Sequence, residues 1–189
     1  MKVLGIMGSP RKGGNTDLLL DEALKGAKSG GAEVEKVVVC DLNIAPCREY
    51  YGCLRDGRCV IKDDMEGIYP KLLEADIVIL ASPIFFYGLS SQAKALIDRC
   101  QALWARKYIL KQVDRSGRKR KGALIAVGAT RGKRLFEGPV LTAKYFFQAI
   151  DVEAGGDLLV RGIDKKGEVK EHPTALGDAS ELGKRLVQV

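Results

Sequence analysis

The sequence predicts an α/β fold in which helices cover both faces of a parallel β-sheet. Three observations support this prediction. Short apolar runs rich in β-branched residues alternate along the chain with longer segments of helical spacing. Polar loops containing glycine or serine follow several of these runs, as is typical where a strand leads into a helix. No repeat or linker interrupts the alternation, so residues 1–189 are expected to form a single domain.

The composition is that of an ordinary globular protein. The chain has 189 residues, of which 46% are hydrophobic and 29% are charged, which is enough for one domain with a two-sided core. The longest apolar stretch lies around residues 77–81 and is far shorter than a membrane span. The N-terminus lacks the pattern of a signal peptide, so a cytoplasmic protein without membrane association is expected.

In the first half of the chain, strands are expected at residues 3–7, 34–39 and 77–81. The first helix is expected to begin with Asn15 or Thr16 as its cap and to stop at Gly30 and Gly31. A second helix, from Met65 to about Leu73, leads into the third strand. The stretch from Cys40 to Asp64 has no periodic pattern and is expected to be irregular.

The second half continues the alternation. Helical spacing runs from 91 to 103, a polar segment extends to 121, and further strands are expected at 123–127 and 158–160. One helix runs between these two strands, through Leu141, Phe146 and Ile150, and another closes the chain at 174–187. The five expected strands are therefore separated by helical segments, as a parallel sheet requires.

The net charge of +7 raises the question of a nucleic-acid partner. Much of the excess lies in one segment, which Ser116 and Gly117 mark as a loop. No helix-turn-helix or zinc-finger pattern accompanies it, so no nucleic-acid binding is expected. A solvated basic loop is the favoured interpretation, and attraction for an anionic cofactor such as NADPH is the alternative. The basic residues of the segment are Arg115, Arg118, Lys119, Arg120 and Lys121.

The loop after the first strand, from Gly8 to Thr16, has the composition of a phosphate site. Backbone N–H groups at a glycine-rich turn and a helix N-terminus attract anions. Ser9, Asn15 and Thr16 can donate hydrogen bonds, and Arg11 can supply a charge-assisted one. The spacing fits neither a nucleoside-triphosphatase loop nor a dinucleotide fingerprint. The alternative is a strand–helix turn without a ligand.

The loop after the third strand, from Ser82 to Ser90, carries two phenylalanines and a tyrosine. These side chains could wall a flat ring, or they could pack against a helix or a partner subunit. In the sheet order 2-1-3-4-5, strands one and three flank the switch point at which ligands bind. A phosphate loop and an aromatic loop therefore meet at one place. Their joint position predicts FMN as the ligand.

The motifs together resemble those of the NADPH-dependent FMN reductase and iron–sulfur flavoprotein family, by sequence over about the first hundred residues and mainly by topology beyond. The matching motifs are Gly8-Ser9-Pro10-Arg11, Gly14-Asn15-Thr16, Ser82-Pro83-Ile84, Tyr87-Gly88 and Leu96-Ile97-Asp98-Arg99. The resemblance implies a flavodoxin-like three-layer sandwich and a homodimer or homotetramer, with the site near a subunit interface. It implies an FMN phosphate bound by Ser9, Arg11, Asn15 and Thr16. It also implies a flavin ring lined by Pro83, Ile84, Phe85, Phe86, Tyr87 and Gly88, with Ala129, Thr130, Arg131 and Gly132 on its far side.

Three of the five cysteines, Cys47, Cys53 and Cys59, lie at equal intervals in the irregular stretch. Iron–sulfur members of the resembled family have a compact run of four cysteines before a similar Asp-Asp-Met. This chain departs from that pattern, because Tyr50 stands where the further cysteine is expected. A [4Fe–4S] cluster normally takes four thiolates. Neither Cys40 nor Cys100 is an obvious fourth ligand.

Three interpretations of the cysteines remain. The first is a cluster held by three cysteines and an outside ligand. The second is a zinc site, which is disfavoured because His172 is remote in sequence. The third, which we favour, is a segment whose thiols are structural or free, with Tyr50 and Tyr51 filling space or covering the flavin. It predicts a flavin-only protein when the chain is isolated in air.

The expected activity is NAD(P)H-dependent reduction of flavin, quinone or another small acceptor by an FMN-binding oxidoreductase. The cofactor carries the redox chemistry, so no catalytic side chain is named. The only histidine, His172, precedes Pro173 and is expected to be solvated. The alternative is an electron carrier that serves protein partners, like a flavodoxin or an iron–sulfur flavoprotein. The basic charge favours the enzyme, since flavodoxins are typically acidic. The acceptor and the preference for NADH or NADPH stay open.

Overall fold

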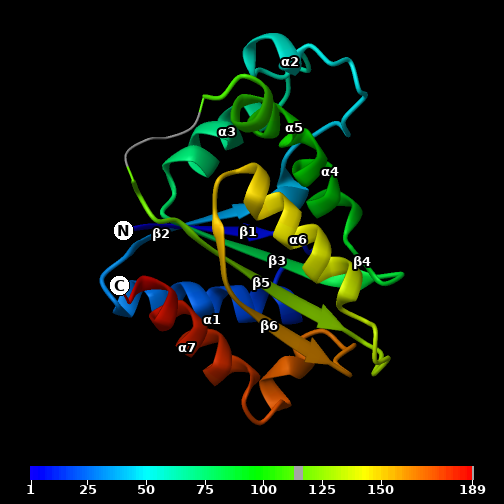
Figure 1. Cartoon of the computed structure of the whole chain (residues 1–189). Helices are drawn as coiled ribbons and strands as arrows, with labels where there is room; N and C mark the ends of the chain where they lie inside the picture. The colour runs from blue at the N-terminus through cyan, green and yellow to red at the C-terminus, as the bar shows by residue number, and fades with distance from the viewer. Residues whose placement is uncertain (113–116, 189) are drawn as a thin grey trace.

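A computed structural model describes residues 1–112 and 117–188. It is a three-layer α/β sandwich around a parallel sheet in the order β2-β1-β3-β5-β6 (Figure 1). Counted along the chain, these five strands have the predicted order 2-1-3-4-5, so the flavodoxin-like topology is confirmed. A sixth short strand, β4, pairs antiparallel with β3. The strands are β1 (Lys2–Met7), β2 (Glu33–Val38), β3 (Ile77–Phe85), β4 (Gly88–Leu89), β5 (Lys121–Gly128) and β6 (Glu153–Arg161).

Helices cover the two faces of the sheet, and alternate strand residues point to each. One face, packed by α1 and α7, buries Val3, Ile79 and Ile125. The opposite face, packed by α3 to α6, buries Leu4 and Leu80. The helices of the first face are α1 (Asn15–Ser29) and α7 (Ala175–Val187). Those of the second are α3 (Met65–Glu74), α4 (Ser91–Arg99), α5 (Gln101–Trp104) and α6 (Glu137–Ala149).

Short helical turns lie in the connections. They are η1 (Val39–Asp41), α2 (Cys53–Asp56), η2 (Ala105–Ile109) and η3 (Glu168–Glu171). The predicted helix at 91–103 is thus divided at Cys100 into α4 and α5, and it continues as the π turn of η2. None of the described helices is long and apolar enough to cross a membrane.

The third strand is longer than predicted and forms a hairpin. Pairing with β5 continues through Ser82 and Pro83, and Ile84 then pairs with Leu89 of β4. The turn consists of Phe86 and Tyr87, whose φ angles of 48° and 62° are in the left-handed region. The expected loop after the third strand is therefore a β-hairpin. Aromatic residues are common in strands, so the aromatic residues after Ala81 belong to the strand and its hairpin. The sequence prediction took them for a loop and therefore ended the third strand too early.

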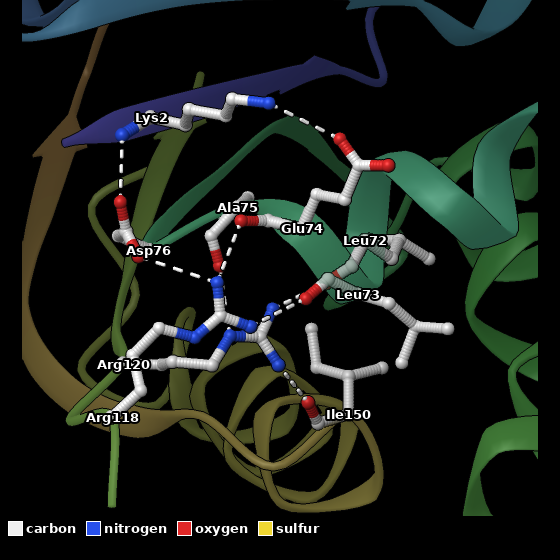
Figure 2. A network of polar contacts seen from close by, with 9 residues as sticks. All are labelled: Lys2, Leu72, Leu73, Glu74, Ala75, Asp76, Arg118, Arg120 and Ile150. Carbon is white, nitrogen blue, oxygen red and sulfur yellow. Dashed lines mark hydrogen bonds and ion pairs between the residues drawn. The ribbon is translucent and has the colours of Figure 1, made fainter. Parts of the chain in front are cut away.

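Residues 117–120 form a loop, as predicted, but the loop is not simply solvated: Arg120 is buried, and Arg118 and Arg120 both donate hydrogen bonds to carbonyls at helix C-termini (Figure 2). Arg120 is only 5% exposed. Its guanidinium donates to the Ala75 carbonyl at 2.8 Å, to the Ile150 carbonyl at 2.5 Å and to the Leu72 carbonyl. Such carbonyls have no partner inside their own helix, and a cation satisfies them. Arg115 lies outside the described residues.

The guanidinium of Arg118 lies beside that of Arg120 and donates to the carbonyls of Leu73 and Glu74 at 2.7 and 2.9 Å. His172 also differs from its prediction as a solvated residue. Its Nδ1 accepts hydrogen bonds from the N–H groups of Thr174 and Ala175 at 3.3 and 3.1 Å, so it caps the start of α7.

Candidate functional site

The loops after β1 and β3 are tied together by two buried serines. Ser90 Oγ donates to the Gly8 carbonyl at 2.5 Å, and the Ser90 N–H donates to Ser82 Oγ at 3.0 Å. Both serines are 0% exposed. Gly8 must remain a glycine here, because a Cβ would lie 2.7 Å from that of Ala93. The two predicted motifs therefore form one rigid unit at the carboxyl edge of the sheet.

The glycine-rich loop turns tightly into α1. The Gly14 N–H donates to the Arg11 carbonyl at 3.0 Å, and Gly13 has a left-handed φ of 67°. The Gly13 N–H donates to the Asp17 carboxylate at 2.7 Å. The helix cap is Gly14 and makes no side-chain hydrogen bond, so the predicted cap at Asn15 or Thr16 is wrong. First-turn N–H groups that lack a side-chain cap are suited to an anion.

A cavity of about 210 Å³ lies between this loop and β3. It brings together polar residues of the first loop with apolar residues from β3 and from the start of the loop after β5. The predicted residues that line it are Ser9, Arg11, Asn15, Thr16, Pro83, Ile84, Phe85 and Ala129. They come from distant parts of the chain, as the switch-point argument requires.

The other predicted residues lie around the cavity without lining it. Phe86 is fully exposed at the hairpin tip. The Tyr87 hydroxyl packs against Gly132, where a Cβ would lie 2.7 Å from it. The Arg131 guanidinium lies against Gly162, at the end of β6. Gly88 belongs to β4, and Thr130 is an exposed residue of the loop after β5. The hairpin thus contacts the loop after β5, and that loop in turn contacts the residue that follows β6.

Sequence reasoning missed a fourth segment, from residue 163 to 169, that contributes Ile163, Asp164 and Lys166 to the cavity. Asn15 anchors it: its amide donates to the Lys165 carbonyl at 2.9 Å and accepts from the Val169 N–H at 3.1 Å. The segment follows the last strand of the sheet. Since parallel strands end at one edge, that position was the available signal.

The turn of this fourth segment is held by Glu168. Its carboxylate accepts from the N–H groups of Asp164 and Lys165 at 2.7 and 2.8 Å, and these bonds lower its pKa. A larger cavity of about 560 Å³ lies elsewhere, where β5 and β6 begin. Ligands of open α/β sheets bind beyond the carboxyl ends of the strands, so the smaller cavity is the candidate site.

A second cavity, of about 410 Å³, is lined by Cys47, Cys53 and Cys59. All three thiols are free and partly buried. Burial raises the pKa of Cys53, and its neighbour Cys59 raises it further. Within residues 1–112 and 117–188, no group of three or more His, Cys, Asp or Glu side chains is placed to hold a single metal ion.

A buried ion pair closes the base of the cysteine segment. Arg99 and Asp63 have side chains 0% and 5% exposed and pair through both oxygens of the carboxylate, at 2.5 and 3.1 Å. The same guanidinium donates to the carbonyl of Ala45 at 2.9 Å and to that of Ile61 at 3.1 Å. These carbonyls lie just before Cys47 and just after Cys59. One arginine therefore fixes both ends of the segment.

Burial lowers the pKa of Arg99, but the hydrogen bond to Asp63 and, after it, the interaction with Cys59 raise that pKa above its ordinary value. Its Nε is buried and makes no hydrogen bond within the part of the chain that the structure describes. The Tyr69 hydroxyl, which donates to the Arg99 carbonyl at 2.9 Å, interacts with the same thiol. Burial is the main reason that the pKa of Tyr69 is raised.

Comparison with known proteins identifies the family. An iron–sulfur flavoprotein of Methanocaldococcus jannaschii is 35% identical over the whole chain and 97% of its own length. A Bacillus subtilis protein, named as an NAD(P)H-dependent FMN-containing oxidoreductase, is 28% identical over 98% of both chains. The structure of an NAD(P)H:quinone oxidoreductase from Methanothermobacter marburgensis superposes with a TM-score of 0.70 at 14% identity, covering 100% of this chain and 96% of the other. Residues 1–137 match the NADPH-dependent FMN reductase family. The chain belongs to that family and is an FMN-binding, NAD(P)H-dependent oxidoreductase.

Proposed function

We propose that FMN binds across the first cavity, with its phosphate on the loop from Ser9 to Thr16. The observation that carries this proposal is the start of α1, which lacks a side-chain cap and lies beside Arg11 in the cavity. Ser9 is 4% exposed, and its Oγ accepts the Arg11 N–H at 3.2 Å, which keeps the turn in place. The loop thus offers a prepared anion site.

We propose that the hairpin and the loop after β5 bind the flavin ring. Pro83, Ile84 and Phe85 offer apolar surface beside the phosphate loop, and Ala129 lines the same cavity at the start of the loop after β5. The bound cofactor supplies the hydride and electron chemistry. The side chains bind and orient it, and the apolar ones exclude water. We further propose that a small quinone or flavin accepts the electrons.

The phosphate assignment is tested by titrating the apoprotein with FMN and with riboflavin, which lacks the phosphate. Arg11→Ala removes a charge-assisted hydrogen bond of about 1.5–3 kcal/mol, so FMN affinity should fall roughly ten- to a hundred-fold. Riboflavin affinity should hardly change. Lys12→Ala is the matched control, since Lys12 pairs with Asp41 at 2.6 Å outside the cavity. Equal binding of FMN and riboflavin by the unmodified protein would contradict the assignment.

A second candidate function is that of an iron–sulfur flavoprotein that passes electrons on to a partner. The specific observation in its favour is the convergence of Cys47, Cys53 and Cys59 on one cavity. The name of the Methanocaldococcus relative points the same way. In that case a cluster would be held by these thiols and would supply one-electron chemistry. Anaerobic purification followed by iron and sulfide analysis tests this candidate.

We also propose that residues 1–189 act as one domain and that the protein is a cytoplasmic homodimer or homotetramer. Five free cysteines are typical of a reducing compartment. The hairpin exposes Phe85, Phe86 and Tyr87 by 50%, 104% and 53%, which favours burial against a second copy. Sedimentation equilibrium of the unmodified protein and of a Phe86→Ser variant tests the assembly.

A further inference from the structure

Lys166 brings to the first cavity a cation that the described fold does not pair. It lines the cavity from the fourth segment, residues 163 to 169, and its exposed side chain makes no ion pair or hydrogen bond with the described residues. Arg11 and Asp164 are the other charged residues of the described lining. Two cations and one carboxylate therefore line the cavity, and the excess of positive charge suits an anion.

The path of the fourth segment brings Lys166 to the phosphate loop. Gly162 and Gly167 have left-handed φ angles of 73° and 81°, which let the chain leave β6 and turn back before η3. As a result, Cε of Lys166 lies 3.8 Å from the position that a Cβ would have on Gly13, just before α1. The ammonium group is carried by the next atom of that side chain. It can therefore reach an anion bound at the start of α1.

Asn15 holds this segment in place across 150 residues of sequence. Its nitrogen donates to the Lys165 carbonyl, and its oxygen accepts the Val169 N–H. Val169 is 0% exposed, so this end of the segment is also fixed in the core. Glu168 holds the turn between these two contacts through two backbone N–H groups. The polar atoms of Asn15 are thus directed at the segment that carries Lys166.

The charge of the ligand matches this arrangement. A phosphate monoester carries about 1.5 to 2 negative charges at pH 7, so one cation does not balance it. Arginine binds such a group through two parallel hydrogen bonds, and lysine binds it as a compact point charge. Arg11 in the loop after β1 and Lys166 in the segment after β6 supply one of each.

We propose that Lys166 is a second cation that binds the FMN phosphate, and that Asn15 is a positioning residue which acts through Lys166. Asn15 would then contribute to FMN binding by holding residues 163–169, and not as a donor to the phosphate. This inference rests on the proposed FMN site. It joins the loop after β1 and the segment after β6 into one phosphate site.

The first test titrates the apoprotein with FMN and with riboflavin, followed by flavin fluorescence. Lys166→Ala should lower FMN affinity roughly three- to tenfold, which lies between the effects of an exposed ion pair and of a buried charge-assisted bond. Riboflavin affinity should not change, which also shows that the variant is folded. Lys166→Arg keeps the charge and should retain most of the FMN affinity. Lys170→Ala is the matched control, because it removes one exposed lysine of η3 outside the cavity.

A double-mutant cycle tests the role of Asn15. Asn15→Ala removes both contacts with the fourth segment and should weaken the binding of FMN but not that of riboflavin. In the Lys166→Ala background, the same change should cost much less, because two residues that act through one contact are not additive. If Asn15→Ala lowers FMN affinity by the same factor in both backgrounds, Asn15 contacts the phosphate directly and its positioning role is wrong.

Failure of this inference differs from failure of the FMN site itself. If Lys166→Ala binds FMN as tightly as Lys170→Ala does, while Arg11→Ala still weakens FMN, the second cation is wrong and the phosphate loop stands. If the unmodified protein binds FMN and riboflavin equally, the phosphate assignment and the role of Lys166 both fall.

Discussion

Two buried arginines perform different tasks at two places in this molecule. Arg120 directs all three of its guanidinium nitrogens at carbonyls near the ends of α3 and α6 (Figure 2). Arg99 directs two nitrogens at a carboxylate and two loop carbonyls and leaves Nε without a hydrogen bond. Both side chains are almost completely buried. Every guanidinium nitrogen of Arg120 therefore donates a hydrogen bond to the fold. Arg99 instead keeps one nitrogen, Nε, without such a bond, and its guanidinium lies beside the Cys59 thiol.

The difference lies in what each arginine joins. Arg120 connects helix ends that the hydrophobic core already positions, so its contribution is to stability. Arg99 connects the two ends of an irregular segment that has little core of its own. Its partner Asp63 also accepts the N–H groups of Ala45 and Met65 at 3.0 and 3.1 Å. The cysteine cavity therefore depends on one ion pair.

The largest expected effect comes from breaking that pair. Asp63→Ala leaves the Arg99 charge buried without a counterion and should lower the free energy of unfolding by about 3–5 kcal/mol. Urea unfolding, followed by the fluorescence of the single tryptophan, measures it. That residue is Trp104 in α5, close to the cysteine segment.

The neighbouring residue provides the control for this prediction. Asp64 is exposed, and its carboxylate accepts a single backbone N–H, that of Asn43, at 2.7 Å. Asp64→Ala should cost about 1 kcal/mol. An equal loss of unfolding free energy in the two variants would show that the Arg99–Asp63 pair stabilises the protein no more than an exposed carboxylate does.

The second effect comes from Arg120. Arg120→Met keeps much of the apolar packing but leaves carbonyls of Leu72, Ala75 and Ile150 without this donor, at a cost of about 3 kcal/mol. FMN affinity should not change, because these contacts lie at the opposite edge of the sheet from the phosphate loop. Arg118→Met, at a more exposed position, should cost about 1 kcal/mol. If Arg120→Met weakens FMN binding, the division between the two arginines is wrong.

The sequence predicts the glycine loop and the order of the strands far better than it predicts the cysteine segment. The glycine loop and the five-strand order follow from local patterns: apolar runs, glycines at turns and a helix that starts at a polar residue. The cysteine segment has no such pattern, because its shape depends on Arg99, which lies 36 residues beyond Asp63. The same holds for Arg120, whose acceptors are 30 to 48 residues away. Long-range hydrogen bonds from one side chain leave no periodic trace.

The fourth cavity segment was missed for a related reason. Its contact with the phosphate loop is made by Asn15, which sequence reasoning assigned to capping and phosphate binding. The strand before it was also predicted to start five residues too late, since Gly155, Gly156 and a β-bulge disguise the start of β6. A strand with two glycines reads as a loop.

The smallest effect is a pH dependence confined to one of the two regions. Burial alone would raise the pKa of Asp63, but hydrogen bonds from Arg99 and from two backbone N–H groups outweigh it and hold the pKa below its usual range. A carboxyl with a lowered folded pKa contributes stability above its unfolded pKa of about 3.9 and loses it as the pH falls through the folded value. The carbonyls that Arg120 binds do not titrate. On acidification below about pH 4, Trp104 fluorescence should therefore change before the far-ultraviolet circular dichroism of the sheet and helices. In Asp63→Asn, which cannot titrate, the early fluorescence step should disappear. Coincident transitions in the unmodified protein would mean that the cysteine segment and the sheet lose their structure together, and that the ion pair does not act locally.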